Sequence, residues 1–147
     1  MIQIKRIRSA RRSDLARVVE IDALITRVRK PAYWADVLRR YSTRRRGRFF
    51  LVAETDAGVQ GYIVGDVRDW EFGSPPCGWV FDLGVHPRAR LSGLATQLLA
   101  EVCRRLRASG VDKLRTLLAR DNALVLAFFR SQGMMAAPLI TLEKDLE

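Results

Sequence analysis

One sequence pattern constrains the fold of this chain most. An apolar strand is followed by a short turn that contains a proline, and then by a long amphipathic helix. Residues 78–85 read GWVFDLGV and lead into the turn HPRARLSG, and residues 93–109 then repeat apolar side chains on one helical face. The first amide groups of a helix have no intrahelical partner and lie at the positive end of its dipole. Since Gly93 leaves the backbone accessible, the sequence predicts an anion site, suited to a phosphate group, at the start of this helix.

The rest of the chain alternates strand and helix patterns around this unit. Strands are expected at residues 2–8, 49–54, 59–67, 78–85, 114–119 and 139–143. Helices are expected at residues 13–26, with Ser13 as the N-cap, and at residues 31–41, 93–109 and 122–132. This order predicts a mixed α/β fold in a single domain over residues 1–147.

Composition narrows the class of protein. The chain of 147 residues is 48% hydrophobic and 29% charged, which is typical of a globular domain. No apolar run approaches the ~20 residues that span a bilayer, and the N-terminus lacks the apolar segment of a secretory signal. Cys77 and Cys103 form no disulfide framework, and a single histidine argues against a zinc site. We therefore expect a cytoplasmic protein without a membrane partner or a bound metal.

The net charge of +10, from 26 basic and 16 acidic residues, has three interpretations. Basic clusters at residues 5–12, 27–30, 39–48 and 104–107 fit a solvated arginine-rich surface, which we favour. They also fit electrostatic attraction of an anionic cofactor or an acidic substrate. Nucleic-acid binding is the least favoured, because aromatic residues do not alternate with the basic ones.

Two segments resemble signatures of the GNAT superfamily of acyl-CoA-dependent N-acyltransferases. The family's pyrophosphate signature is Q/R-x-x-G-x-G/A, and here Arg90, Gly93 and Ala95 fill its three defined positions. Val85 and Pro87 match the V-x-P that usually precedes it. The resemblance implies a phosphate site of the kind that the turn itself predicts.

The second similar segment lies downstream, where residues 120–134 read RDNALVLAFFRSQGM. The family commonly shows R-x-N and then N-x-x-A-I/L-x-L/F-Y-x-x-x-G-F. Phe128, Phe129 and Gly133 occupy the L/F, Y and G positions, and Met134 stands where a phenylalanine is usual. Phe129 thus replaces the tyrosine that often serves as the acid for the departing thiolate.

The resemblance implies a mixed sheet of about six or seven strands flanked by four helices, with strands splayed apart at the acyl-CoA site. It implies that acetyl-CoA, or another acyl-CoA, is the co-substrate and that no metal is needed. The cofactor-binding residues that it implies are Leu83, Gly84, Val85, Arg88, Arg90, Leu91, Ser92, Gly93, Leu94, Ala95, Thr96, Asn122 and Phe129.

These residues have distinct implied roles. The backbone of residues 83–85 would pair with the pantetheine arm, and the amide of Val85 would stabilise the oxyanion. The amides of residues 91–96 would bind the pyrophosphate, with Arg88 and Arg90 as possible partners, and Asn122 would hydrogen-bond the pantetheine. Each also has a purely structural interpretation: sheet pairing, exposed turn arginines and a helix N-cap for Asn122.

The implied reaction is attack of an amine on a thioester, which needs a neutral amine although an alkylamine has a pKa near ~10.4. The family's usual glutamate base falls at Trp79, so Asp82, Glu71 and His86 are the candidate bases. Strand alternation places Asp82 on the opposite face unless a bulge rotates it. Glu71 lies in the preceding loop, and His86, whose ordinary pKa is near neutrality, lies in the turn. A water chain, or a weakly basic acceptor such as an arylamine, is an equal alternative.

The main hypothesis is an N-acetyltransferase that moves an acetyl group from acetyl-CoA to a primary amine of a small molecule or protein. The alternative is a non-catalytic acyl-CoA-binding sensor or partner protein with a degenerate active site, which the residues at positions 79 and 129 favour. The resemblance also allows a homodimer. The acceptor itself cannot be deduced, because the loops at residues 30–48 and 70–77 carry no recognisable motif.

Overall fold

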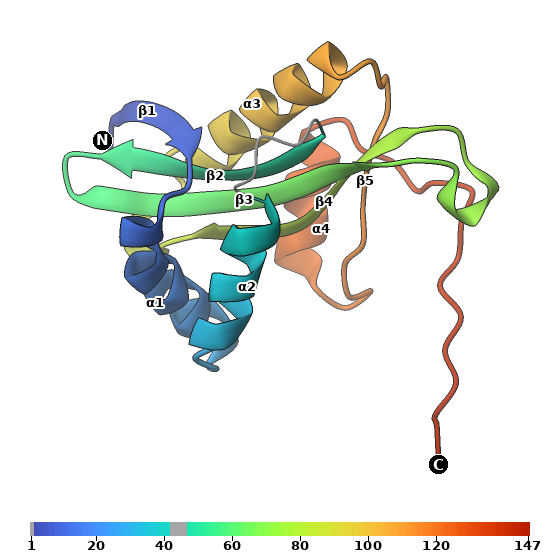
Figure 1. Ribbon diagram of the computed structural model, residues 1–147, viewed down its shortest axis with the longest axis horizontal. Coiled ribbons are helices and arrows are strands. Elements are labelled where there is room, and N and C mark those ends of the chain that lie inside the picture. The colour runs from blue at the N-terminus through green and yellow to red at the C-terminus, as the bar shows by residue number, and fades with distance from the viewer. Residues whose placement is uncertain (1, 42–46) are drawn as a thin grey trace. The chain divides into compact units, whose positions relative to one another are not determined.

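Among the described residues, five strands form one mixed sheet with the order β1-β2-β3-β4-β5 (Figure 1). The structure is a computed structural model that describes residues 2–41 and 47–147, so residues 43–46 of the expected basic loop lie outside the described part. The chain divides into two compact units, Met1–Leu117, which contains the sheet, and Leu118–Glu147.

The first unit follows the strand and helix order that the sequence predicts. Its elements are β1 (Ile4–Ser9), α1 (Leu15–Thr26), α2 (Pro31–Tyr41), β2 (Arg48–Thr55), β3 (Gly58–Arg68), β4 (Cys77–Val85), α3 (Leu94–Ala108) and β5 (Leu114–Thr116). Three 3-10 turns, η1 (Arg12–Asp14), η2 (Glu71–Gly73) and η3 (Pro87–Ala89), connect them. β1 to β4 pair antiparallel with their neighbours and β5 runs parallel to β4, which confirms the expected mixed α/β fold.

Helices cover the two faces of this sheet, with α1 and α2 on one face and α3 on the other (Figure 1). We call these the α1/α2 face and the α3 face. The core of the α1/α2 face centres on Trp34, whose ring lies 5.6 Å from that of Phe50 and 4.9 Å from that of Tyr62. On the α3 face the buried leucines of α3, Leu94 and Leu98 among them, close over the strands. The sheet is therefore buried on both sides in the region of β3 and β4.

The strands differ from the expectation in three respects. Within residues 2–41 and 47–147 the sheet has five strands, slightly fewer than the six or seven expected, and the strand expected at residues 139–143 does not form. A strand needs a neighbour to pair with, and the described residues offer that segment no partner. β5 is also shorter than expected, because it ends at Thr116 instead of residue 119.

The second unit contains α4 (Ala123–Ser131), close to the bounds that its sequence pattern predicts. The side-chain oxygen of Asn122 accepts a hydrogen bond from the N–H of Val125 at 3.2 Å and so caps the helix. Gly133, with φ of 84°, follows its C-terminal end.

The start of α1 is held by Asp14 and not by Ser13, the N-cap that the sequence favoured. The carboxylate of Asp14 accepts the N–H of Arg11 at 2.8 Å and both terminal nitrogens of Arg8 at 2.7 and 2.9 Å. Burial alone would raise the pKa of Asp14, but the hydrogen bonds from Arg8 and Arg11 outweigh burial and lower that pKa. The first turn is therefore fixed to β1 by a largely buried, bidentate ion pair.

We expect Asp14→Ala to lower the free energy of unfolding by about 3 kcal/mol, because it leaves the Arg8 guanidinium buried without this partner. Ser13→Ala is the matched control and should change it by less than about 0.5 kcal/mol. Urea denaturation at neutral pH measures both. A lowered carboxyl pKa contributes stability that is lost as the pH falls. The difference in the free energy of unfolding between Asp14→Ala and the wild type should therefore narrow below pH 3.8. Equal losses in the two variants would contradict this account.

Candidate functional site

β4 carries a bulge in the middle of the strand. On β3, Val64 pairs with Asp82 and the next residue, Gly65, pairs with Val80, so Phe81 has no partner. An extra residue of this kind shifts the alternation of side chains beyond it. Before Phe81, the even-numbered side chains of β4 point to one face of the sheet. After Phe81, the even-numbered side chains point to the opposite face.

The surroundings of two glycines show this exchange. A Cβ added at Gly78 would lie 2.6 Å from the side chain of Leu106, which belongs to α3. A Cβ added at Gly84 would lie 2.4 Å from the ring and hydroxyl of Tyr62, on the α1/α2 face. Asp82, two residues before Gly84, therefore also lies on the α1/α2 face. The bulge that the sequence analysis named as the condition for Asp82 to serve as a base is present.

Asp82 is half-buried on the α1/α2 face. Burial, and then the negative charge of Asp22, raise the pKa of Asp82 to about 7, although Lys30 and the N–H of Leu83 act in the opposite direction. Asp22 itself is buried in α1, where it accepts a hydrogen bond from the indole of Trp34 at 2.9 Å and forms an ion pair with Lys30 at 3.1 Å. A carboxyl with a pKa near 7 can both accept and return a proton at physiological pH.

His86 has a structural role in the turn that follows β4. The imidazole Nδ1 of His86 accepts a hydrogen bond from the backbone N–H of Arg88 at 3.1 Å. The backbone N–H of His86 donates to the carbonyl of Gln60 at 2.8 Å. Burial, and then the positive charge of Arg17, lower the pKa of the imidazole. His86 is therefore neutral at physiological pH, with one ring nitrogen occupied.

The structure does not place Glu71 near the C-terminal end of β4, where Asp82 and His86 lie. Glu71 is exposed on η2, before β4 begins. β4 has 9 residues, which at about 3.3 Å per residue gives about 26 Å between its ends. Of the two candidate carboxyl groups, Asp82 thus lies closer along the chain to Val85, and its pKa is raised.

The edge of β4 that faces β5 is open near its C-terminal end. Pairing between the two strands runs from Gly78 only as far as Val80 and Thr116, and beyond it the described residues give β4 no partner strand on this side. The N–H of His86 points toward β3. Because the groups of an antiparallel strand alternate, the N–H of Val85 points to the open side. The two strands thus splay apart as expected, and the Val85 amide can donate to an oxyanion there.

The turn at residues 86–93, which we call the phosphate turn, exposes its backbone. Leu91 and Gly93 have left-handed backbone conformations, with φ of 63° and 86°. The hydroxyl of Ser92 donates to the carbonyl of Ala89 and closes the turn. Apart from Gly93 and its two chain neighbours, the described residues place no heavy atom within 4 Å of the position that a Cβ on Gly93 would take. The space above this glycine is therefore open, and a phosphate group can approach the peptide nitrogens directly.

The other predicted residues of this turn divide into exposed and buried. Arg88, Arg90 and Leu91 have exposed side chains, whereas Leu94 anchors α3 in the core. α3 has no side-chain N-cap, because Gly93 occupies that position. Its first amides, which include that of Ala95, have no partner within the helix.

The remaining two predicted cofactor residues belong to the second unit. Asn122 caps α4, as its structural interpretation predicts. Phe129 is buried, with its ring 5.2 Å from that of Phe128 in an edge-on arrangement. Neither side chain has a group that titrates near neutral pH.

Three residues of the site were not singled out by the sequence analysis: Asp22, Lys30 and Tyr62. They belong to α1, the segment before α2, and β3, so no local spacing links them. A signal for Tyr62 exists only once the register places it opposite Gly84.

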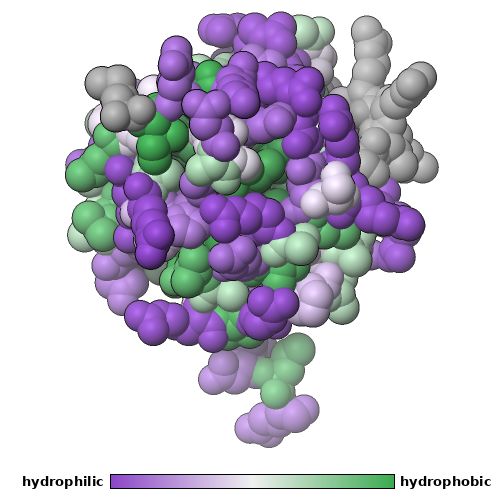
Figure 2. Space-filling view, turned by 90° about the vertical axis from the view of Figure 1, so that its left-hand side faces the viewer, coloured by the Kyte–Doolittle hydropathy of each residue, from purple (hydrophilic) through white to green (hydrophobic). Residues whose placement is uncertain are grey.

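Much of the positive charge lies in surface ion pairs. Arg104 and Arg105 both pair with Glu101, and Arg6 pairs with Glu54. Figure 2 shows one face of the molecule, where hydrophilic residues predominate and hydrophobic ones are scattered between them. This pattern supports a solvated arginine-rich surface. Over residues 2–41 and 47–147, no helix is long and apolar enough to cross a membrane, and no three His, Cys, Asp or Glu gather as metal ligands.

The acetyltransferase (GNAT) family model matches residues 15–134 of this chain. An aminoglycoside N-acetyltransferase, AAC(6')-Iy in complex with CoA, is 16% identical with a TM-score of 0.83, covering 99% of this chain and 96% of that one. The aminoglycoside antibiotic 6'-N-acetyltransferase AAC(6')-IG from Acinetobacter haemolyticus is 19% identical with a TM-score of 0.78, covering 97% and 99%. A transcriptional regulator from Bacillus halodurans is 16% identical with a TM-score of 0.80, covering 99% and 100%. At these identities the structures show a common fold.

Proposed function

Because this chain belongs to the acetyltransferase (GNAT) family, we propose that it transfers an acetyl group from acetyl-CoA to a primary amine. The observation that carries the proposal is the bulge in β4, which puts Asp82 beside a strand edge that is open and leads into the phosphate turn. The aminoglycoside acetyltransferases of similar fold, one of them in complex with CoA, support a small-molecule amine as the acceptor.

Acetyl-CoA would bind along the open edge of β4 and over the phosphate turn. The pyrophosphate would accept hydrogen bonds from the amides of residues 91–96, and the exposed Arg88 and Arg90 would offset its charge. The pantetheine arm would pair with the backbone of residues 83–85, as an added strand does. This arrangement places the thioester at the end of β4, next to the amide of Val85.

Proton transfer is the step for which Asp82 is suited. The ionised carboxylate of Asp82 takes a proton from the acceptor ammonium group. With its pKa raised to about 7, it is a stronger base than an ordinary carboxylate, and the gap to an alkylamine of pKa ~10.4 is correspondingly smaller. The raised pKa is therefore a functional property of the bulged strand.

The neutral amine then attacks the thioester carbonyl carbon. A C–N bond forms and the carbonyl oxygen becomes an oxyanion that the Val85 N–H stabilises. The oxyanion collapses, the C–S bond breaks and CoA leaves as a thiolate. The second amine proton passes to water, and the thiolate takes its proton from solvent because Phe129 has no hydroxyl. The products are the N-acetyl amine and CoA.

Release of free CoA tests this function directly. The purified full chain is incubated with acetyl-CoA and, separately, neamine, n-butylamine, a peptide with a free N-terminus, and aniline, and the thiol is measured together with the mass of the acetylated product. Turnover of at least one amine is the expected result. Tight binding of acetyl-CoA without turnover of any amine would instead favour a non-catalytic acyl-CoA sensor, the function that Trp79 and Phe129 support. Absence of both binding and turnover would contradict both functions.

Phe129→Tyr should leave kcat unchanged or raise it, because it restores a hydroxyl where relatives often have one. The buried ring can cost some stability if the new hydroxyl finds no partner, on the order of 1 kcal/mol. Steady-state kinetics with the best amine, alongside thermal denaturation, separate the two effects. A large fall in kcat with unchanged stability would contradict this expectation and would mean that the ring of Phe129 itself packs on the cofactor.

A further inference from the structure

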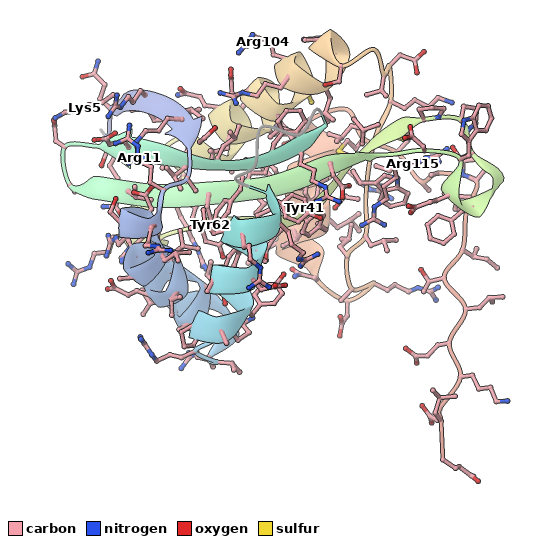
Figure 3. All side chains as sticks on the ribbon, viewed as in Figure 1. Lys5, Arg11, Tyr41, Tyr62, Arg104 and Arg115 are labelled. Atoms are coloured by element: carbon pink, nitrogen blue, oxygen red, sulfur yellow. The ribbon has the colours of Figure 1, made fainter. Side chains whose placement is uncertain are left out.

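Tyr62 of β3 is deeply buried, yet its hydroxyl lies at the site. Only 1% of the residue is exposed, and its ring packs against Trp34. Figure 3 shows Tyr62 on the side of the sheet where α1 and α2 lie. Its hydroxyl stands over Gly84, because a Cβ there would be 2.4 Å from the hydroxyl oxygen. The absence of a side chain at Gly84 is what gives the hydroxyl its place beside β4.

This hydroxyl has no hydrogen-bond partner among the described residues. Within the same residues, every fully buried polar side-chain atom does have a partner. It follows that the hydroxyl oxygen of Tyr62 is in the small part of the residue that a ligand or water can reach. A buried tyrosine normally satisfies its hydroxyl inside the protein, whereas the hydroxyl of Tyr62 is left available to a ligand or water.

Asp82, on the same face, is the charged group that acts most strongly on Tyr62. Tyr62 pairs with Gly84, and Asp82 lies two residues from Gly84 on the same face. Such diagonal neighbours have Cα atoms about 7–8 Å apart, within reach of long side chains. A small group placed between them can touch both. Burial, and then the negative charge of Asp82, raise the pKa of Tyr62 above its ordinary value, so its hydroxyl stays neutral and cannot itself be the base.

We propose that Tyr62 is a second acceptor-binding residue, whose hydroxyl oxygen accepts a hydrogen bond from the amine while Asp82 accepts another. This inference rests on the proposed function. An ammonium group has three N–H donors, so one proton passes to Asp82 along its hydrogen bond while a second N–H stays bound to the Tyr62 oxygen. After the transfer the neutral amine still offers an N–H to Tyr62, which fixes the direction of the nitrogen lone pair. The pair therefore binds and orients the amine during proton transfer.

Tyr62→Phe removes only the hydroxyl and keeps the packing against Trp34, so the variant should fold. Isothermal titration calorimetry with n-butylamine and neamine, in the presence of CoA, measures amine binding whether or not turnover occurs. We expect roughly tenfold weaker amine binding, and an equal rise in the KM for the amine, with the KM for acetyl-CoA unchanged.

Tyr41→Phe is the matched control. The hydroxyl of Tyr41, on the same face, is already hydrogen bonded to Asp66 at 3.1 Å, so its loss should leave amine binding unchanged. Equal amine binding by wild type and Tyr62→Phe would overturn the inference while acetyl transfer stood. A wild type that binds amines but never releases CoA would instead contradict the proposed function, and calorimetry of Tyr62→Phe would still decide the role of Tyr62. A wild type that binds no amine would contradict both.

Discussion

Gly93→Asp should weaken the binding of acetyl-CoA by at least about a hundredfold. The new carboxylate would occupy the open space above the phosphate turn. A charge about 4 Å from a phosphate of the same sign costs on the order of 4 kcal/mol near a protein surface, and each ~1.4 kcal/mol is a factor of ten in affinity. Calorimetric titration with CoA measures the loss. An unchanged affinity would exclude this turn as the pyrophosphate site.

Two controls separate charge from backbone effects. Gly93→Asn has nearly the same shape as Gly93→Asp without the charge, and asparagine tolerates the left-handed conformation. Its effect on affinity should be much smaller. Gly110→Asp introduces the same residue at the other end of α3, where φ is 91° and the surroundings are equally open. This variant should bind CoA as the wild type does, because the strain is similar but the phosphate is far away.

Asp82→Asn should lower kcat/KM at neutral pH by between about a hundredfold and ten thousandfold, the range that loss of a general base produces. In the wild type the base works only when ionised, so the rate should fall as the pH drops through about 7. The variant has no such carboxyl and should lack this limb of the profile. If the profile of Asp82→Asn matches that of the wild type, another group is the base.

Asp82→Asn should increase stability although it lowers activity. A carboxyl whose pKa is raised in the folded state holds its proton there while the unfolded chain has lost it, between pH 3.8 and about 7. Its contribution to stability therefore declines as the pH rises through that window. Asp82→Asn should accordingly raise the melting temperature more at pH 8 than at pH 4. A variant that is more stable yet much less active would identify Asp82 as a residue kept for chemistry.

Local patterns carried the prediction of the phosphate turn and of most elements. The proline, the glycine and the apolar stripe of α3 are all features of adjacent residues, and local chemistry decides their conformation. The choice of Asp14 over Ser13 as the helix cap depended instead on Arg8 in a neighbouring strand, which local preferences do not include. The strand expected at residues 139–143 failed for a similar reason, because a strand is defined by its partner.

The acid–base chemistry of the site was the part that the sequence could describe least. Asp82 appeared among three candidates, but its face and its raised pKa depend on how β4 pairs with β3 and on Asp22 in α1. Tyr62 had no motif at all. Both results come from contacts between segments distant along the chain.

The unpaired Phe81 has a consequence for how related chains are compared. It changes the parity of β4: before it, odd-numbered side chains face α1 and α2, and after it, even-numbered ones do. An alignment that seeks the base six residues before Val85 finds Trp79, and this suggests an inactive enzyme. Counting across the inserted residue finds a carboxylate on the same side as Trp79. Relatives that lack the usual glutamate should therefore be examined for a bulge of this kind before they are classified as inactive.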